Sequence, residues 1–377
     1  MRFVYHAGVL PLIVDEIRSN DLGDTFGVYT LTSAITAIPV ETGLTGWPER
    51  ATFEVDNSYL FLLSRVAIFV ALWQYSPMKI GAFEFKEPIP SFEEAHVIAM
   101  LYPWLDAGSV GTLTLRRLER YFDSQELGRL EKPGNFFDFT RYRPTTRFRN
   151  GQRMQRVPNT RVSQLVGRND PPLILMQVRE PHANAEDYIA SLLEVLKTFN
   201  VTRYTRIGAM YDATPHTRPL QVTGTLNGEP MTGLRGLVSR RRSNYEGPTS
   251  IMNTMSQELT KYGIEDASLM VRLPQYAQLE RDYAGTARLL EILTTIYTLP
   301  GDLADTEAGK KQYEELDAEI TGNPAAQELV KRLESYYDSR NPSNSGEGTE
   351  EESEESDLPP DIQSFLSDMS QRLDNPN

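Results

Sequence analysis

The chain has 377 residues, 24% of them charged and none of them cysteine, which excludes thiol catalysis, cysteine-held metal clusters and disulfides and favours a reducing, cytoplasmic setting. The formal net charge of −14 is unevenly divided, because residues 341–377 hold ten acids and one base whereas residues 78–340 hold 34 acids and 33 bases. This balance argues against a nucleic-acid-binding protein, and the four scattered histidines do not suggest a metal site, so we expect no metal and no cofactor.

Residues 1–77 differ from the rest of the chain. Their most apolar run, residues 59–73, is shorter than the roughly 20 residues that a membrane span needs, and it contains Arg65. A signal anchor and a buried helix are two interpretations of this run. The third treats residues 1–77 as an upstream extension, because periodicity is absent before Tyr59 and a strand can begin at Met78. We give the third the most weight, and we expect no association with a membrane.

Residues 78–300 carry regular signals and form the predicted core domain. Short apolar runs predict strands over residues 95–102, 173–178, 205–210, 220–226 and 267–273. Amphipathic stretches between them predict helices over residues 110–122, 184–196, 250–262 and 282–297. This alternation predicts an α/β fold, a three-layer α/β/α sandwich with a mainly parallel sheet of the phosphorylase/hydrolase-like kind. Two basic runs, residues 141–161 and 235–242, are expected to be solvated faces or contacts between subunits.

Residues after 300 read as three further segments. Residues 301–340 predict a pair of charged helices, and residues 341–358 are a Ser/Gly/Glu-rich acidic linker that we expect to be disordered. Residues 359–377 predict a short amphipathic helix. Its apolar face binds a partner or folds back onto the chain's own domain, two interpretations that we weigh equally. That face consists of Ile362, Phe365, Leu366, Met369 and Leu373.

Several polar side chains follow the predicted strands, where ligands of parallel α/β sheets gather. His216 and Arg218 form the sharpest pair, because an imidazole beside a guanidinium could bind an anion or shuttle a proton, with Glu180 or Asp212 orienting the imidazole. Alternatively, two prolines brace a rigid loop whose His and Arg make structural hydrogen bonds. We favour this alternative, since no nucleophile has a fixed spacing to His216. The other candidate ligand-binding residues are Arg143, Tyr245 and Tyr276.

Gly108 and Gly111 form a turn ahead of a predicted helix. Such a turn could present backbone amides to a phosphate. It lacks the Lys-Ser/Thr of a P-loop and the third glycine of a dinucleotide fingerprint. Close packing of a strand against a helix explains the glycines with fewer assumptions.

The order of these segments resembles the proteasome assembly chaperone family, in particular its prokaryotic members related to the second of the paired eukaryotic chaperones. The resemblance covers about residues 80–298. Within it, the His-Thr-Arg-Pro piece and its order among the others are the specific part. The segments that carry it are Gly108-Ser109-Val110-Gly111, Arg143-Pro144, Arg179-Glu180-Pro181, Pro215-His216-Thr217-Arg218-Pro219, Tyr245-Glu246-Gly247-Pro248 and Leu273-Pro274-Gln275-Tyr276.

The resemblance implies a nucleoside-phosphorylase-like fold and a non-catalytic scaffold that binds a protein complex, proteasome-like in kind, and that forms a homo-oligomer. It transfers no catalytic residues. The alternative is a phosphorylase/hydrolase-type enzyme acting on an anionic small molecule such as a nucleoside or a phosphate ester. Family members that dock on proteasomes end in a hydrophobic residue, a tyrosine and one final residue, whereas this chain ends Leu373-Asp374-Asn375-Pro376-Asn377. That departure puts docking by the terminal carboxylate in doubt.

Overall fold

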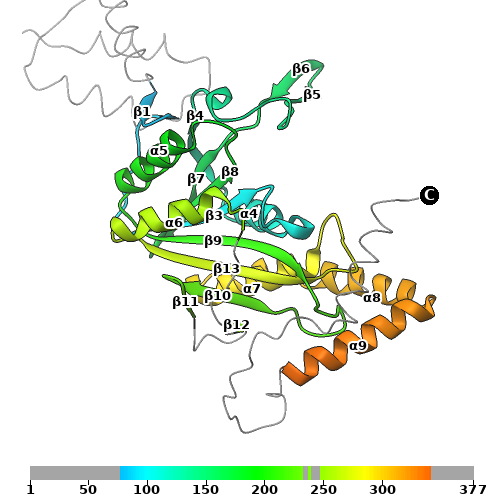
Figure 1. Cartoon of the computed structure of the whole chain (residues 1–377). Helices are drawn as coiled ribbons and strands as arrows, with labels where there is room; N and C mark the ends of the chain where they lie inside the picture. The colour runs from blue at the N-terminus through cyan, green and yellow to red at the C-terminus, as the bar shows by residue number, and fades with distance from the viewer. Residues whose placement is uncertain (1–76, 232–236, 239–246, 341–377) are drawn as a thin grey trace, which may run out of the picture. The chain divides into compact units, whose positions relative to one another are not determined.

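The structure is a computed structural model that describes residues 77–231, 237–238 and 247–340 (Figure 1). The described residues belong to one compact unit that starts at Pro77. The predicted extension at residues 1–77 lies outside the described residues except for Pro77, and so do the acidic linker and the helix over residues 359–377, so these assignments stay predictions.

One large mixed sheet organises the described residues, with the order β1-β2-β4-β7-β8-β3-β9-β13-β10-β11, and β12 paired to β10. Its centre, β8-β3-β9-β13, is parallel, and the strands on both sides of this centre pair antiparallel. The strands are β1 (Met78–Ile80), β2 (Phe83–Phe85), β3 (Ala95–Tyr102), β4 (Gln125–Leu130), β7 (Arg161–Asn169), β8 (Pro172–Arg179), β9 (Val201–Asp212), β10 (Val222–Leu226), β11 (Glu229–Pro230), β12 (Leu237–Val238) and β13 (Glu265–Pro274).

Helices cover both faces of this sheet. The residues of β3 alternate between two buried clusters, since Val97, Ala99 and Leu101 pack with α5 and α6 while Ile98 and Met100 pack with α4 and α7. The three-layer α/β/α prediction is therefore confirmed. The helices are α4 (Val110–Tyr121), α5 (Ala185–Thr198), α6 (Ile251–Lys261), α7 (Tyr283–Tyr297), α8 (Glu307–Thr321) and α9 (Pro324–Arg340), with short 3₁₀ turns at Ala107–Ser109, Pro133–Asn135 and Gly301–Leu303.

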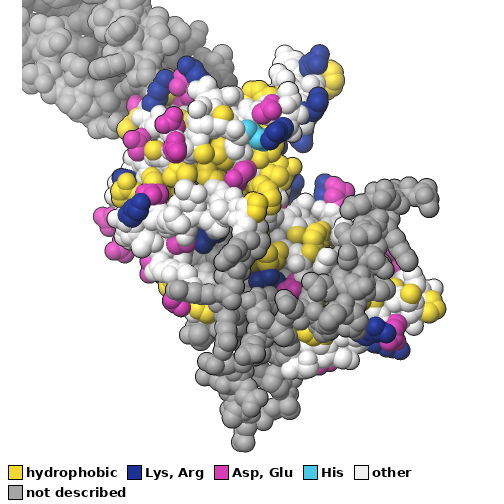
Figure 2. All heavy atoms as spheres, in the orientation of Figure 1, with side chains coloured by type: hydrophobic (Ala, Val, Ile, Leu, Met, Phe, Trp, Pro, Cys, Tyr) yellow, Lys and Arg dark blue, Asp and Glu magenta, His cyan; other side chains and the backbone are white. Residues whose placement is uncertain are grey.

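The surface of the described residues mixes both signs of charge. Figure 2 shows acidic and basic side chains interspersed over the visible face, in keeping with the near balance of acids and bases between residues 78 and 340. Such a surface favours solubility without creating one large field of a single sign.

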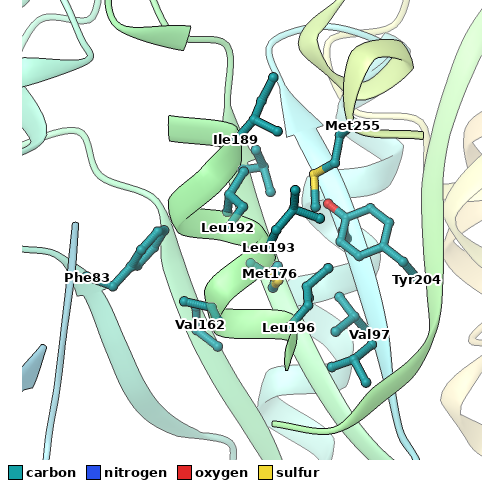
Figure 3. Packing of buried hydrophobic residues seen from close by; sticks show 14 of the residues in the cluster. Phe83, Val97, Val162, Met176, Ile189, Leu192, Leu193, Leu196, Tyr204 and Met255 are labelled. Carbon is teal, nitrogen blue, oxygen red and sulfur yellow. The ribbon is translucent and has the colours of Figure 1, made fainter. Parts of the chain in front are cut away.

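The packing on the α5 side shows how the periodicity of the sequence becomes a core. Leu192 and Leu196 of α5 are fully buried, and Figure 3 shows them lying over Val97 and Met176 of the central strands. The face of α5 that the spacing of apolar residues predicted is thus the face that packs on the sheet. Burial of each such leucine contributes roughly 1.5–3 kcal/mol to folding.

The sequence did not predict the antiparallel strands beside the parallel centre. β4 and β7 contain Arg, Gln and Ser among their apolar residues, so they lack the continuous apolar runs of β3 and β8. A second, separate sheet also went unpredicted, formed by β5 (Thr145–Arg149) and β6 (Gln152–Arg156). The predicted strand over residues 220–226 is present as β10, and it runs antiparallel to β13.

Within the described ranges, none of the helices combines the length and the apolar character that crossing a membrane would require.

Candidate functional site

The carboxyl ends of the four central strands meet at one edge of the sheet. Tyr102 of β3 pairs with Arg179 of β8, and Asp212 of β9 pairs with Pro274 of β13, so the loops after these strands leave from the same edge. These loops carry most of the residues singled out in the sequence. The parallel centre of the sheet is therefore what brings them to one side of the molecule.

His216 lies in the 215–219 loop after β9 and is 7% exposed. Its backbone N–H donates to the Tyr276 hydroxyl (2.8 Å), and its Nδ1 lies 2.6 Å from the same oxygen. The hydroxyl can accept from the backbone and donate its own proton to Nδ1, which leaves the proton of the neutral imidazole on Nε2. That Nε2 points toward Asp317 Oδ1 at 3.4 Å, which is long for a hydrogen bond.

Burial lowers the pKa of His216, and the carboxylate of Asp317 opposes that shift only in part. The imidazole is therefore neutral near pH 7, as the hydrogen bond from Tyr276 to Nδ1 requires. His216 is thus in direct contact with Tyr276, which the sequence had named only as a separate candidate residue. Glu180 and Asp212 were the residues expected to orient the ring, and Tyr276 fills that role instead.

Arg218 is held by two carboxylates of α9. Its Nε and Nη2 donate to Asp338 at 2.9 and 2.8 Å, and its Nη1 donates to Glu334 at 3.0 Å. Thr217 also donates its hydroxyl to Glu334, and Tyr337 donates to the carbonyl of Pro219 (2.8 Å). A guanidinium engaged on both sides by carboxylates has little remaining capacity for an external anion.

Apolar contacts place α9 against the 215–219 loop. Leu329 and Leu333 are buried in a small cluster with Ala213, and Tyr276 packs against it. On the neighbouring α8, Tyr313 donates its hydroxyl to Asp282 (2.9 Å) and its ring meets the His216 ring edge-on. The helix pair predicted over residues 301–340 therefore covers the loop that contains His216 and Arg218 (Figure 1).

Glu180 follows β8, whereas the 215–219 loop follows β9. Since β3 lies between these two strands, Glu180 is in a different part of the carboxyl edge from His216. Its Oε1 accepts from the backbone N–H of Ile251 (2.9 Å) at the start of α6, where a carboxylate also suits the helix dipole. Its Oε2 is buried without a hydrogen-bond partner among the described residues. Burial raises the pKa of this carboxyl above its ordinary value.

Arg179, next to Glu180, is stacked on aromatic rings. Its guanidinium carbon lies 4.6 Å from the Tyr102 ring centre and 5.3 Å from the Tyr142 ring centre, and its Nε donates to the carbonyl of Asn159 (3.3 Å). Burial lowers its pKa. Among the residues with described positions, no carboxylate lies within ion-pair distance of it, in contrast to Arg218. The ring of His182 completes the cluster, 4.6 Å from the Tyr142 ring centre.

The glycine turn ahead of α4 has a packing role. Gly108 has a left-handed φ of +57°, and a Cβ there would lie 2.6 Å from the Cβ of Asp282. The side chain of Asp106 occupies the start of α4, accepting from the backbone N–H of Thr112 (3.0 Å) and from its hydroxyl (2.7 Å). Those contacts use the amide that a phosphate would need, and Gly111 lies against the same carboxylate.

The other candidates divide into two groups. Arg143 is exposed, on the segment that leads into β5, and away from His216 in the chain. Tyr245 and the C-terminal residues Ile362, Phe365, Leu366, Met369 and Leu373 lie outside the described residues.

Exposed aromatic side chains at this edge had not been singled out in the sequence. Trp104 is 58% exposed in the turn after β3, and Tyr102, Tyr211 and Tyr283 are each more than a third exposed on the neighbouring segments. We call these four residues the edge aromatics. A possible signal for them was their position, since each stands at or just beyond the end of a predicted strand or at the start of a predicted helix.

The opposite edge of the sheet has a hollow of about 540 Å³ lined by acidic residues, Glu93, Glu94 and Asp170, together with Pro171, Pro172 and Asn200. Its carboxylates do not suit an anionic ligand. Across the positioned residues, no group of His, Asp and Glu side chains is arranged to hold a metal ion.

The chain matches the model of the PAC2 family over residues 100–321. A PAC2 family protein from Streptomyces avermitilis is 25% identical, with a TM-score of 0.54 over 63% of this chain and 99% of that one. A proteasome-assembly chaperone homologue from Mycobacterium tuberculosis is also 25% identical, with a TM-score of 0.51 over 62% and 99%. A Corynebacterium glutamicum protein of unknown function shares the fold at 20% identity, with a TM-score of 0.60 over 69% and 98%. Curated proteins gave no match.

Proposed function

The chain belongs to the PAC2 family, as its loop segments predicted, and from that premise we propose that it is a non-catalytic, chaperone-like scaffold that binds a protein complex of the proteasome type. The family and the fold of the chaperone homologue support a chaperone-like role in general. We propose in addition that the protein binds such a complex, that it forms a homo-oligomer and that it is located in the cytoplasm.

The observation that carries the proposal is the internal engagement of His216 and Arg218. An enzyme would present these groups to a substrate, whereas here Tyr276 contacts the imidazole and two carboxylates of α9 hold the guanidinium. Arg218 therefore joins α9 to the sheet edge, and His216 joins its loop to Tyr276 after β13. This arrangement supports the interpretation in which the loop is a rigid structural device.

The edge aromatics supply a surface for a protein partner. Aromatic side chains are enriched at the centres of protein interfaces, where they bury a large area at a small cost in conformational entropy. Trp104 and Tyr211 are exposed beside the carboxyl ends of the strands, on a rigid sheet edge. We place the partner-binding surface there.

The test uses the full chain and purified proteasome core particles, with their unassembled subunits, from the same host. Binding is measured by analytical ultracentrifugation. We expect Trp104→Ser to weaken binding at least about tenfold, as for a central interface residue, with the melting temperature unchanged. Tyr262→Ser, an exposed aromatic at the end of α6, serves as the matched control and should bind like the unaltered chain. Absence of binding by the unaltered chain, or equal binding by both variants, would refute the proposal.

One observation favours a second candidate, a phosphorylase/hydrolase-type enzyme that acts on an anionic small molecule such as a nucleoside or a phosphate ester. Arg179 lacks a carboxylate within ion-pair distance in the described part of the chain and lies beside Glu180, whose pKa is raised by burial. Thermal-shift measurements with inorganic phosphate and with nucleoside monophosphates separate the two functions. A stabilisation that Arg179→Gln abolishes would support the enzyme; no shift with any of these anions would refute it.

A further inference from the structure

The sequence contains two Asn-Gly pairs, and each of them forms the turn of a β-hairpin. Asn150 and Gly151 join β5 to β6, and Asn227 and Gly228 join β10 to β11. The φ angles are +50° and +75° in the first turn and +52° and +82° in the second. Positive φ at both central residues is what a two-residue hairpin turn of type I′ requires. Both asparagines are exposed, so the two turns are a matched pair with the same residues and nearly the same φ angles.

An asparagine that precedes a glycine can lose its side-chain amide in a reaction that needs only water. The backbone nitrogen of the glycine gives up its proton to water or hydroxide and attacks Cγ of the asparagine. A C–N bond forms, the side-chain nitrogen leaves as ammonia, and a five-membered succinimide results. Water then adds to one of the two ring carbonyls and breaks its bond to the ring nitrogen, which gives aspartate or isoaspartate. No atom is oxidised or reduced, and glycine favours the reaction because it has no side chain to hinder the nitrogen.

The side chain of Asn227 is held in place by the main sheet. Its Oδ1 accepts from the backbone N–H of Asp266 at 2.9 Å, and its backbone N–H donates to the carbonyl of Asp266 at 2.7 Å. β10, which leads into this turn, pairs with β13 along its whole length. Cγ of Asn227 therefore cannot approach the nitrogen of Gly228 without breaking contacts of the sheet.

The side chain of Asn150 makes no hydrogen bond to any residue whose position the structure describes. β5 and β6 pair only with each other, and every residue of both strands is exposed. Figure 1 shows their hairpin as a projection from the body of the described residues. A two-stranded hairpin with no covered face is marginally stable, so it opens often. Each opening lets Cγ of Asn150 approach the nitrogen of Gly151.

The charges near the two turns also differ in sign. Residues 141–156 contain six arginines and no acidic residue or lysine, and Figure 2 shows basic side chains gathered on this projection. Residues 219–231 contain one acidic residue, Glu229, and no basic residue. The attacking nitrogen and the intermediate that it forms carry developing negative charge, which nearby guanidinium groups stabilise and a nearby carboxylate disfavours. Charge and mobility therefore both favour the reaction at Asn150.

We propose that Asn150 is a site of spontaneous deamidation and that Asn227 is protected from it. The reaction places a carboxylate at the tip of the basic hairpin, and isoaspartate also adds a carbon atom to the backbone of the turn. The inference goes beyond the proposed function, because it assigns a covalent change to a turn that the proposed function does not use. It gives the hairpin a limited lifetime in its original charge state.

The test follows both turns in the same sample of the full chain. The protein is incubated at neutral pH and digested at mildly acidic pH, where hydroxide is scarce, and peptide mass spectrometry measures the fractions of Asn, Asp and isoAsp at each position over time. We expect Asn150 to be converted at least about tenfold faster than Asn227. High salt should slow conversion at Asn150 by about twofold or more, because it screens the arginines. Equal rates at the two positions would overturn the proposal.

Arginine variants separate the effect of charge from that of mobility. Arg149→Gln with Arg153→Gln should slow conversion at Asn150 by about threefold or more and leave Asn227 unchanged. The matched control, Arg281→Gln with Arg332→Gln, removes two exposed arginines outside the hairpin and should change neither rate. Hydrogen exchange measures mobility, and the amide of Gly151 should exchange faster than that of Gly228. Equal exchange of these two amides would refute mobility as a cause, and an unchanged rate in the hairpin variant would refute charge as a cause.

Discussion

The most direct test of the geometry around His216 is Tyr276→Phe, which removes one oxygen atom. That hydroxyl meets the backbone N–H of His216 at 2.8 Å and its Nδ1 at 2.6 Å, and His216 itself is buried. The variant leaves both polar atoms of His216 without this partner. A buried polar group left unsatisfied costs about 1–3 kcal/mol, so we expect a loss of about 2–4 kcal/mol in the free energy of unfolding.

For a domain of this size, that loss lowers the melting temperature by roughly 5–10 °C, measured by differential scanning calorimetry near pH 7.5. Tyr283→Phe is the matched control, because Tyr283 lies near the same edge and its ring is exposed. The control should change stability by less than about 0.5 kcal/mol. A Tyr276→Phe protein as stable as the control would refute the assignment of the hydroxyl as the shared partner of both His216 atoms.

Three further predictions follow from the same edge. Gly108→Ala should lower the free energy of unfolding by at least about 2 kcal/mol, because the position has a left-handed φ and an added Cβ would lie 2.6 Å from a neighbouring Cβ. Gly301→Ala, with open space around the added Cβ, should lower it by less than about 0.5 kcal/mol. Chemical denaturation of the two variants compares these values. Leu333→Ala, at a fully buried position in the cluster under α9, should cost about 2–4 kcal/mol and should speed hydrogen exchange in α9 before it affects β9. The pKa of His216 is lowered in the folded state, so its contribution to stability is fully present above its ordinary value of 6.5 and is lost as the pH falls from that value toward the lower pKa of the folded state. His216→Gln should therefore show a smaller drop in melting temperature between about pH 7.5 and 5.5, and a drop equal to that of the unaltered chain would contradict the assignment.

The sequence predicted those parts of the fold whose burial is uniform. β3 and β8 are covered on both faces, so their apolar runs are continuous, and α5 has one buried face, so its apolar residues recur at helical spacing. β5 and β6 are exposed on both faces and consist of Arg, Thr and Gln with single apolar residues. Their sequence pattern does not distinguish a strand from a loop, because neither strand has a buried face that would require apolar residues at alternate positions.

The sequence predicted that several polar residues follow the central strands, and it did not predict most of the contacts that these residues make. His216 and Tyr276 follow neighbouring strands, and their contact follows from the parallel register of β9 and β13. The partners of Arg218 could not be predicted, since no local pattern links an arginine to carboxylates so far along the chain. Glu334 and Asp338 do carry a weak signal, because acids four residues apart lie on one face of a helix.

The closure of the 215–219 loop by α9 also sets an order of events during synthesis. Asp338 follows Arg218 by 120 residues in the chain. At about 5–20 residues per second, a ribosome needs roughly 6–24 s to make that stretch. During this interval the guanidinium of Arg218 and the imidazole of His216 have no covering helices, because α8 and α9 have not yet been made. The 215–219 part of the carboxyl edge therefore stays open to solvent and to other proteins in the nascent chain, and it is covered only when the last described helix has emerged.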